Sequence, residues 1–463
     1  KMEGDSKHRS RGGIQASHSC GTPLIPKDTI KKYLCNFSES LNVEAPTNLK
    51  WQYALVIPAY RESESFFNTL KSLPKPSGNL LVILVINKPS WDQKKDSNQE
   101  LRDLINNLEE PFNKNNNVEI KSLRYGVDVL VIDHEKIFGA HAKCNVGLAR
   151  KIGFDLALAW YAAGKIESDW LLSTDADAIL PSDYFKRIEN IKSTCKAICW
   201  PFCHMPSNDN SVDTACKMYV LHMHHYALGL TYANSPYNYH SLGSCISVRA
   251  RAYAEVRGFP KKDAGEDFYM LNKLSKVGNI HCETGQCISL ATRESDRVPF
   301  GTGPAISAIV NSKVMPVEYK LYHPQCFTAL KAVINSIPKL WSDAAIPLRD
   351  ILEKQKIPKE LAIAAEESLI KLGITKAIAH CREHASSNTT FFNHFLIWFD
   401  AFRTLKFIHN LGDDHLPKIT LREYRNYLPS NWPINILQDL SLEDLLSAHR
   451  KHFDWKNMDS SHW

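Results

Sequence analysis

Short apolar runs alternate with helical stretches over roughly the first two thirds of the chain. Such runs are typical of strands that are buried on both faces of a parallel sheet. The expected strands are Ala54–Ile57, Leu80–Ile86, Val127–Ile132 and Trp170–Ser173, and the expected helices are Glu62–Leu73, Leu101–Leu108 and Lys143–Tyr161. Repeated strand–helix units predict a doubly wound, Rossmann-like α/β domain with a mainly parallel sheet.

The pattern changes near residue 315. Of the 20 glycines, 18 precede residue 314, and helical spacing dominates afterwards. Pro358 and Gly373 bracket a predicted helix over Lys359–Leu372, and aromatic residues recur at three- and four-residue steps over Phe391–Phe407. The expected division is an N-terminal arm without periodicity (1–48), an α/β catalytic domain (49–315) and an α-helical C-terminal domain (316–463).

Composition narrows the class of protein. Hydrophobic residues make up 44% and charged residues 23% of the 463 positions, which excludes wholesale disorder and a small stapled scaffold. The net charge of +6, without a basic stretch interleaved with aromatics, argues against a nucleic-acid partner. Twelve cysteines and no leader-like opening predict reduced thiols in a cytoplasm.

The longest stretch without Asp, Glu, Lys or Arg is Met218–Val248, but its histidines, Asn234 and Pro236 argue against a membrane span. No transmembrane segment is therefore expected. The aromatic segment Phe391–Phe407 could contact a membrane surface, although packing inside the helical domain is the favoured interpretation.

Two polar segments follow predicted strands. Val56–Glu62 leaves the first strand at Pro58, and the carboxyl ends of strands are where ligands bind in open α/β sheets. Asp175 and Asp177 follow the strand Trp170–Ser173, so both carboxylates can face one point beyond the sheet. Two such oxygen ligands suit Mg²⁺ or Mn²⁺ with substrate phosphates completing the shell. An ordinary turn and a chance acidic motif are the competing explanations.

Two further segments complete the candidate chemistry. Gly265-Glu266-Asp267 opens an apolar helical stretch, so these carboxylates either cap a helix or supply a general base. Arg293 and Arg297 lie in a segment with hydroxyls and glycines that could hold a diphosphate. Surface ion pairs with Glu294 or Asp296 are the alternative for the arginines.

Together, Val56–Glu62, Asp175–Asp177 and Gly265–Asp267 resemble the family-2 glycosyltransferases, which have the A-type, nucleotide-diphospho-sugar-binding fold. Gly147–Gly153 is similar to that family's G-x-A-R-N-x-G segment, and Gly243–Phe259 to its acceptor-side segment. The resemblance covers roughly residues 51 to 310 and does not extend to the helical C-terminus.

The resemblance implies a metal-dependent, non-processive, inverting transfer of a sugar from a nucleoside-diphosphate sugar, UDP- or GDP-linked, to a hydroxyl acceptor. The cofactor would be Mn²⁺ or Mg²⁺, and the general base would be Asp267, with Glu266 beside it. The implied residues are Pro58, Ala59, Tyr60, Glu62, Asn87, Arg150, Asp175, Arg293 and Arg297 for the donor; Gly243, Ser244 and His225 for the acceptor; and Asp177, Asp175 and His281 for the metal. Met218–Val248 is expected to line the acceptor pocket.

The sequence departs from the family pattern in places. Lys151 stands where asparagine is usual, Asn87-Lys88-Pro89 replaces an aspartate pair, no Q-x-x-R-W follows, and an Asn- and Lys-rich insertion spans Trp91 to Asn117. Two rival functions stay open: a nucleotidyltransferase, for which Val56–Glu62 lacks the expected glycines, and a non-catalytic nucleotide-sugar-binding module.

Histidines and cysteines offer weaker signals. His222 and His225 share a helix face, so a zinc site is conceivable, although pocket lining or core packing is the favoured interpretation. Cys195, Cys199 and Cys203 lack zinc-ribbon pairing and are expected to be small buried hydrophobes.

Overall fold

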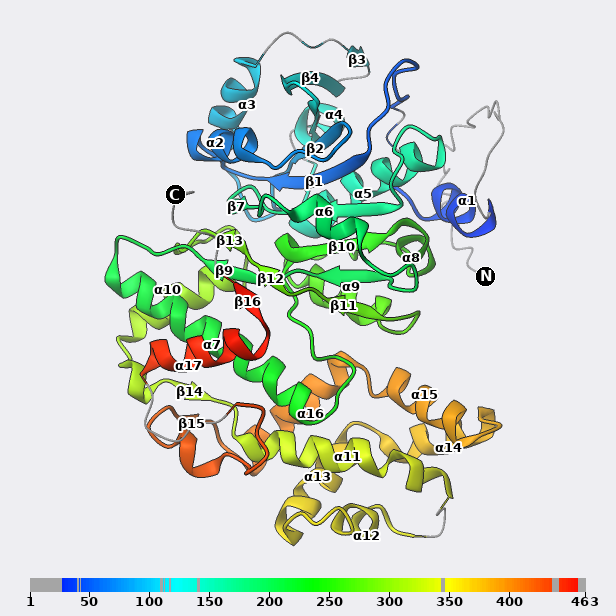
Figure 1. Cartoon of the computed structure of the whole chain (residues 1–463), viewed down its shortest axis with the longest axis vertical. Helices are drawn as coiled ribbons and strands as arrows, with labels where there is room; N and C mark the ends of the chain where they lie inside the picture. Colours follow the sequence, from blue (N-terminus) through cyan, green and yellow to red (C-terminus); the bar gives the residue numbers. More distant parts are fainter. Residues whose placement is uncertain are drawn as a thin grey trace, which may run out of the picture.

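The computed structural model describes residues 27–39, 41, 43–108, 111, 113–115, 118–139, 142–342, 346–434 and 441–456. Its centre is a sheet of nine strands within these ranges, in the order β11-β8-β10-β6-β1-β2-β5-β4-β3 (Figure 1). The strands are β1 (Tyr53–Ala59), β2 (Leu80–Ile86), β3 (Asn113–Asn115), β4 (Val118–Arg124), β5 (Val127–Asp133), β6 (Trp170–Ser173), β8 (Ala197–Cys199), β10 (Ile246–Arg249) and β11 (Ile280–Cys282). The central strands β6, β1, β2 and β5 are parallel, while β10 and β4 pair antiparallel with their neighbours.

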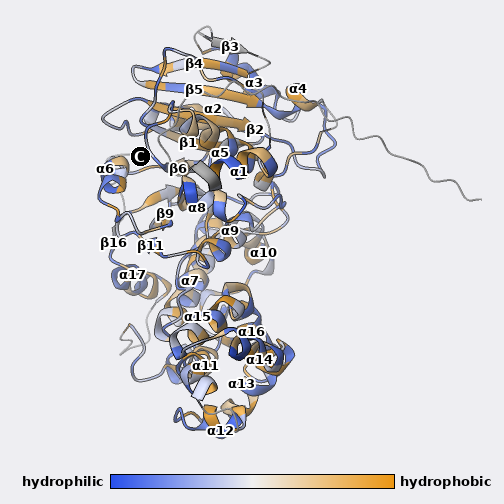
Figure 2. Ribbon diagram, turned by 90° about the vertical axis from the view of Figure 1, so that its right-hand side faces the viewer, coloured by the Kyte–Doolittle hydropathy of each residue, from blue (hydrophilic) through white to orange (hydrophobic). Residues whose placement is uncertain are grey.

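The sheet is buried on both faces, as the apolar runs predict. Alternate residues of β1 point into two different clusters: Leu55 into the one with α2 (Glu64–Ser72) and α3 (Gln99–Asn106), and Val56 into the one with α5 (Val146–Ala162). Hydropathy colouring shows these apolar strands between the helices in Figure 2. The predicted α/β class with a mainly parallel sheet and a helical C-terminal region is confirmed.

Other elements complete this α/β part. They are α4 (His134–Phe138), α6 (Tyr184–Glu189), α7 (Asn210–Tyr232), α8 (Ala250–Glu255), α9 (Glu266–Leu274), α10 (Thr302–Ser312) and the short strands β7 (Ala178–Ile179), β9 (Phe202–His204), β12 (Gly285–Gln286) and β13 (Ile288–Leu290). Part of the insertion predicted over Trp91 to Asn117 is buried, because Leu101 and Ile105 of α3 pack in the hydrophobic cluster of the sheet.

The helical region lies at the opposite end of the molecule from β4 (Figure 1). Its helices are α11 (Pro324–Ser342), α12 (Leu348–Glu353), α13 (Lys359–Lys371), α14 (Ile374–His384), α15 (Asn388–Trp398) and α16 (Ala401–Asp414). The aromatic segment over Phe391–Phe407 is two helices, because Asp400 caps α16 by accepting a hydrogen bond from Arg403 N. Phe391, Phe395 and Phe407 are buried in the helical core.

The chain after residue 315 does not pack only within the helical region. β14 (Lys320–Leu321) pairs with β15 (Ile419–Thr420), and α17 (Leu442–His452) packs on α7. β16 (Trp455–Lys456) then pairs with β12. Leu445 and Leu446 of α17 pack in the hydrophobic cluster of the sheet, so the C-terminal segment returns to the α/β part. The distribution of glycines along the sequence could not indicate this return. No helix among the described residues is long and apolar enough to cross a membrane.

Part of the predicted N-terminal arm forms a helix that packs on the α/β part. Residues 1–26, with the basic Ser/Gly-rich stretch, lie outside the described residues, but α1 (Lys27–Asn36) packs against α5 and α8. Tyr33 of α1 is buried and donates a hydrogen bond of 2.6 Å to Asp155 Oδ1. Asp155 also accepts from Lys151 Nζ at 3.0 Å and from Tyr253 Oη at 2.8 Å. Lys151 therefore belongs to a buried ion pair that fastens α1.

We expect Asp155→Ala to lower the free energy of unfolding by about 3–5 kcal/mol, because it leaves Lys151 as an unpaired buried charge. Urea unfolding followed by tryptophan fluorescence measures the change. Arg251→Ala is the matched control, since it breaks the exposed Arg251–Glu255 pair of α8 and should cost less than about 1 kcal/mol. Equal losses in the two variants would contradict a stabilising role for the buried pair.

Candidate active site

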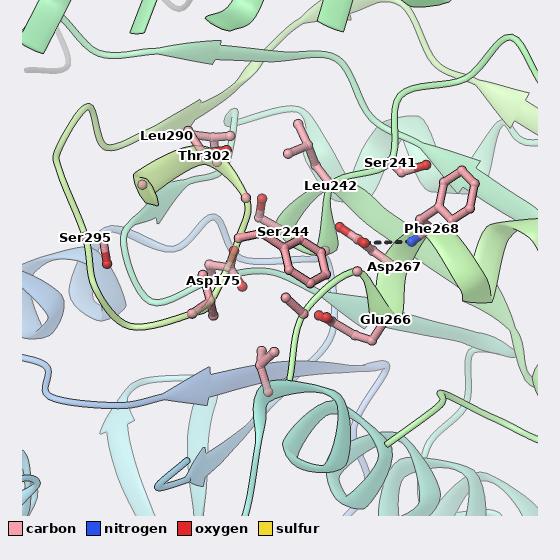
Figure 3. Close-up of a pocket in the computed structure, with 18 of the residues that line it drawn as sticks. Asp175, Ser241, Leu242, Ser244, Glu266, Asp267, Phe268, Leu290, Ser295 and Thr302 are labelled. Atoms are coloured by element: carbon pink, nitrogen blue, oxygen red, sulfur yellow. Dashed lines mark hydrogen bonds between the residues drawn. The ribbon is translucent and has the colours of Figure 1, made fainter. Parts of the chain in front are cut away.

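A cavity of about 610 Å³ opens at the carboxyl ends of β1, β2 and β6 (Figure 3). It brings together most of the site residues predicted from the sequence, which come from segments more than 200 positions apart. These are Pro58, Tyr60, Glu62, Asn87, Arg150, Asp175, Asp177, Gly243, Ser244, Glu266, Asp267, Arg293 and Arg297.

Arg150 is the centre of the polar network in this cavity. Its side chain is buried on α5, and its three guanidinium nitrogens each have a different acceptor. Nε donates to Glu266 Oε1 at 2.9 Å, Nη1 to Ser173 Oγ at 2.6 Å and Nη2 to Asp175 Oδ1 at 2.5 Å. The two carboxylates raise the pKa of Arg150 against the opposing effect of burial. One arginine thus ties the end of β6 to the start of α9.

Gly243 lies against this network. A Cβ atom at Gly243 would clash with the Arg150 guanidinium, so only glycine lets the loop before β10 approach the arginine. Ser244 follows and lines the cavity (Figure 3).

The start of α9 places two adjacent carboxylates at the cavity. Gly265 precedes them with φ 70°, a left-handed conformation that favours glycine. Glu266 is buried and held by Arg150, whereas Asp267 accepts a hydrogen bond from Phe268 N at 2.6 Å, drawn in Figure 3. Burial and the negative charge of Glu266 raise the pKa of Asp267 well above that of an ordinary aspartate. Asp267 is consequently a carboxyl group suited to accept a proton near neutral pH.

Both arginines of the Gly-rich segment are paired inside the site. Arg293 donates to Asp177 Oδ2 from Nε at 3.0 Å and from Nη2 at 2.6 Å. Arg297 Nη1 donates to Glu62 Oε1 at 2.5 Å, and burial raises the pKa of Glu62. The surface pairs considered for these arginines are not formed; Asp296 instead contacts Arg61 at 3.3 Å. The segment therefore closes over the ends of β1 and β6.

The insertion after β2 contacts two residues that line the cavity, Tyr60 and Asn87, which the sequence did not indicate. Tyr60 Oη donates to Asp92 Oδ2 at 2.7 Å, and its ring meets Trp91 edge-on. Asn98 is buried and donates from Nδ2 to Asn87 O at 3.0 Å. These contacts fix the loops that follow β1 and β2.

Three predicted residues lie elsewhere. Ala59 is buried in the sheet core and does not line the cavity. His225 does not line it either, because its Nδ1 contacts Tyr424 Oη at 2.9 Å and its Nε2 contacts Tyr322 O at 2.8 Å. With both nitrogens engaged, His225 cannot form the zinc pair considered with His222. His281 lies on β11 and contacts Glu283 Oε2 at 2.9 Å, away from the cavity lining.

Part of the charge-free segment lines the cavity. Tyr219, His222, Met223 and Tyr226 of α7 face it, and the next loop adds Tyr237, Tyr239, His240, Ser241 and Leu242. Cys195, Cys199 and Cys203 are buried, as the sequence suggested. Ala401 and Leu405 of α16 were not anticipated, because nothing in the sequence relates that helix to the sheet.

The charge balance of the cavity is negative. Its lining holds six carboxyl groups, on Glu62, Asp175, Asp177, Asp263, Glu266 and Asp267, against the three arginines at 150, 293 and 297. Burial lowers the pKa of its histidines, to about 4 for His204 and His222 and to about 3 for His240, so they add no positive charge near neutral pH.

The donor set of this cavity fits a divalent cation. Asp175 Oδ2 and Asp177 Oδ1 are not used in the arginine contacts given above, and both side chains are about one-third exposed. Among the described residues, no third His, Cys, Asp or Glu joins them at ligand spacing. Such a pair matches Mg²⁺ or Mn²⁺, which binds one or two carboxylates and takes other oxygens from substrate.

No family model matches the sequence, and no curated protein resembles it closely enough to be matched. Among solved structures, S. aureus TarS 1–349 in complex with UDP-GlcNAc aligns with a TM-score of 0.34 and 12% identity over 87% of this chain and 89% of that one. The mannosyltransferase PcManGT from Pyrobaculum calidifontis, in complex with GDP-Man and Mn²⁺, aligns with a TM-score of 0.32 and 13% identity over 83% and 93% of the two chains. Similarity of this degree assigns no activity, so the function has to be inferred from the cavity.

Proposed function

We propose that this chain transfers a sugar from a nucleoside-diphosphate sugar to a hydroxyl acceptor, with a divalent cation and inversion at the anomeric carbon. The observation that carries the proposal is the Arg150 network, in which Asp175 at the end of β6 and the Glu266–Asp267 pair at the start of α9 meet in one cavity. The sequence motifs that resemble family-2 glycosyltransferases supply those same residues.

The donor binds across the ends of β1 and β2. Pro58, Tyr60, Glu62 and Asn87 line the cavity and would hold the base and ribose of the nucleotide. A diphosphate would enter a cavity that already has more carboxylates than arginines, and like charges repel. Asp175 and Asp177 would hold Mn²⁺ or Mg²⁺, which neutralises charge on the departing nucleoside diphosphate.

Transfer requires a base for the acceptor hydroxyl. Asp267 takes the proton while the acceptor oxygen forms a bond to the anomeric carbon. The bond between that carbon and the phosphate oxygen breaks, and the nucleoside diphosphate leaves with the electron pair. Glu266 and Arg150 position α9, and Arg293 and Arg297 hold the segment over the donor.

Asp177→Asn should abolish Mn²⁺-dependent donor binding, because an amide is a poorer ligand for a hard cation than a carboxylate. The measurement is the melting temperature with UDP-, GDP- and dTDP-sugars, with and without Mn²⁺, since a ligand that binds only the folded protein raises it. Asp169→Asn, at the other end of β6, should keep the wild-type response. Donor binding that is unchanged in Asp177→Asn would contradict the metal assignment.

Asp267→Asn should lower kcat by about 10²–10⁴-fold, the usual contribution of a general base, while donor affinity stays as in wild type. Release of nucleoside diphosphate measures turnover, and the thermal shift measures binding. If Asp267→Asn kept a turnover close to that of Asp169→Asn, Asp267 would not be the general base.

The activity should also have an acid limb above the range of an ordinary aspartate. Protonated Asp267 cannot accept a proton, so kcat/KM rises with pH through its elevated pKa. Glu266→Gln removes the negative neighbour that favours the protonated form and should move this limb to lower pH. A limb that stays in place or moves to higher pH would contradict Asp267 as the titrating base.

A further inference from the structure

One half of the cavity is lined by aromatic and apolar side chains. This aromatic half comprises Tyr219, Met223, Tyr226, Phe268 and Leu405. Phe268 follows the proposed base Asp267 directly, so this half adjoins the place where an acceptor hydroxyl must lie (Figure 3). In the proposed reaction, Phe268 would therefore lie beside the part of the acceptor that carries the reacting oxygen.

Helix α7 supplies one wall of the aromatic half. Most of this helix is buried, but Tyr219, His222, Met223 and Tyr226 keep partial exposure. Their three- and four-residue spacing places them on one helix face, and all four line the cavity. The wall is thus a continuous surface of rings and a thioether.

Helix α16 of the helical region also contributes to the cavity lining, through Ala401 and Leu405, four positions apart. Its position is fixed relative to α9. Asp400 Oδ2 accepts hydrogen bonds from Lys276 Nζ at 2.6 Å and Asn272 Nδ2 at 3.1 Å, and Asn272 Oδ1 accepts from Ala401 N at 2.9 Å. Since α9 also begins with Glu266 and Asp267, one helix holds both the base and the α16 wall.

The charges of this half exclude one class of acceptor. No lysine or arginine lines it in the described part of the chain, and the three arginines of the cavity are paired with Glu62, Asp177 or the Asp175–Glu266 pair. Glu266, the carboxylate next to the base in the sequence, is paired with Arg150, and Asp175 shares the same guanidinium. A phosphorylated or carboxylated acceptor would therefore meet carboxylates without an unpaired cation, and like charges disfavour its binding.

We infer that the acceptor is an uncharged, hydroxyl-bearing ring compound of the neutral glycoside type, and that Leu405 of α16 limits what fits. This inference rests on the proposed sugar transfer. A saturated or aromatic ring covers the tyrosines and Met223, while its hydroxyl groups can reach the tyrosine and serine oxygens that line the cavity. The helical region thereby acquires a role in acceptor selection.

The test compares neutral and anionic members of matched acceptor pairs. Methyl and p-nitrophenyl hexosides are assayed against the corresponding 6-phosphates and uronides, with the donor that raises the melting temperature. We expect at least one neutral compound to increase nucleoside-diphosphate release, with kcat/KM at least about tenfold above its anionic counterpart. Equal or better use of the anionic members, or no neutral compound acting above donor hydrolysis, would overturn the inference.

Leu405→Arg tests the wall itself. The added cation should reduce the preference for the neutral member of a pair and change the acceptor KM, while the donor KM stays as in wild type. Asn410→Arg adds the same charge to α16 outside the cavity lining and should keep the wild-type preference. If the two variants had identical effects, Leu405 would have no specific role in acceptor selection.

The outcomes of these experiments distinguish a failure of the acceptor inference from a failure of the proposed sugar transfer on which it rests. If no nucleotide sugar shifts the melting temperature of wild-type protein, the proposed sugar transfer fails. If a donor binds and is turned over but phosphorylated acceptors are preferred, only the acceptor class is wrong.

Discussion

The candidate site depends on one buried guanidinium. Arg150 is enclosed on α5 and is charged, so it has to be compensated where it lies. Ser173, Asp175 and Glu266 provide this compensation, and in doing so they are held within one network. The end of β6, the start of α9 and the glycine turn at Gly243 are all placed by the same side chain. Removal of Arg150 would leave two carboxylates facing each other in the cavity.

Helix α5 uses a second buried cation for a different purpose. Lys151 is adjacent to Arg150 in sequence but points to another side of the helix, where it pairs with Asp155 under α1. One residue therefore organises the cavity and the next fastens the N-terminal segment. Lys151 departs from the G-x-A-R-N-x-G pattern without affecting the Arg150 network, because its partner is Asp155 beneath α1.

The charged side chains of the cavity also bear on which part would bind the donor and which the acceptor. Over the whole cavity, carboxylates outnumber arginines, and at the proposed donor end each arginine is already paired with a carboxylate, so a bound diphosphate would call for an additional cation. Beside the proposed base, Arg150 is already paired with Glu266 and Asp175, and aromatic rings line the cavity, which favours a neutral acceptor. In the proposed reaction a single cavity would combine a charged donor with an uncharged acceptor, and a metal ion would be needed only for the donor.

The amino-acid pattern alone predicted the four central strands β1, β2, β5 and β6, the polar residues at carboxyl ends of strands and the carboxylates that begin α9, because each is a local pattern of burial or chain reversal. It also indicated that the charge-free segment around α7 faces a pocket. The contacts between these distant segments are visible only in the folded chain. Arg293 and Arg297 pair with Asp177 and Glu62 across more than 100 residues, His225 turns into the core, and α17 returns to α7. Leu405 reaches the cavity because Asp400, which caps its helix, accepts hydrogen bonds from Asn272 of α9 and from Lys276 just after that helix. Contacts between distant segments depend on the whole packing, and no local periodicity encodes them.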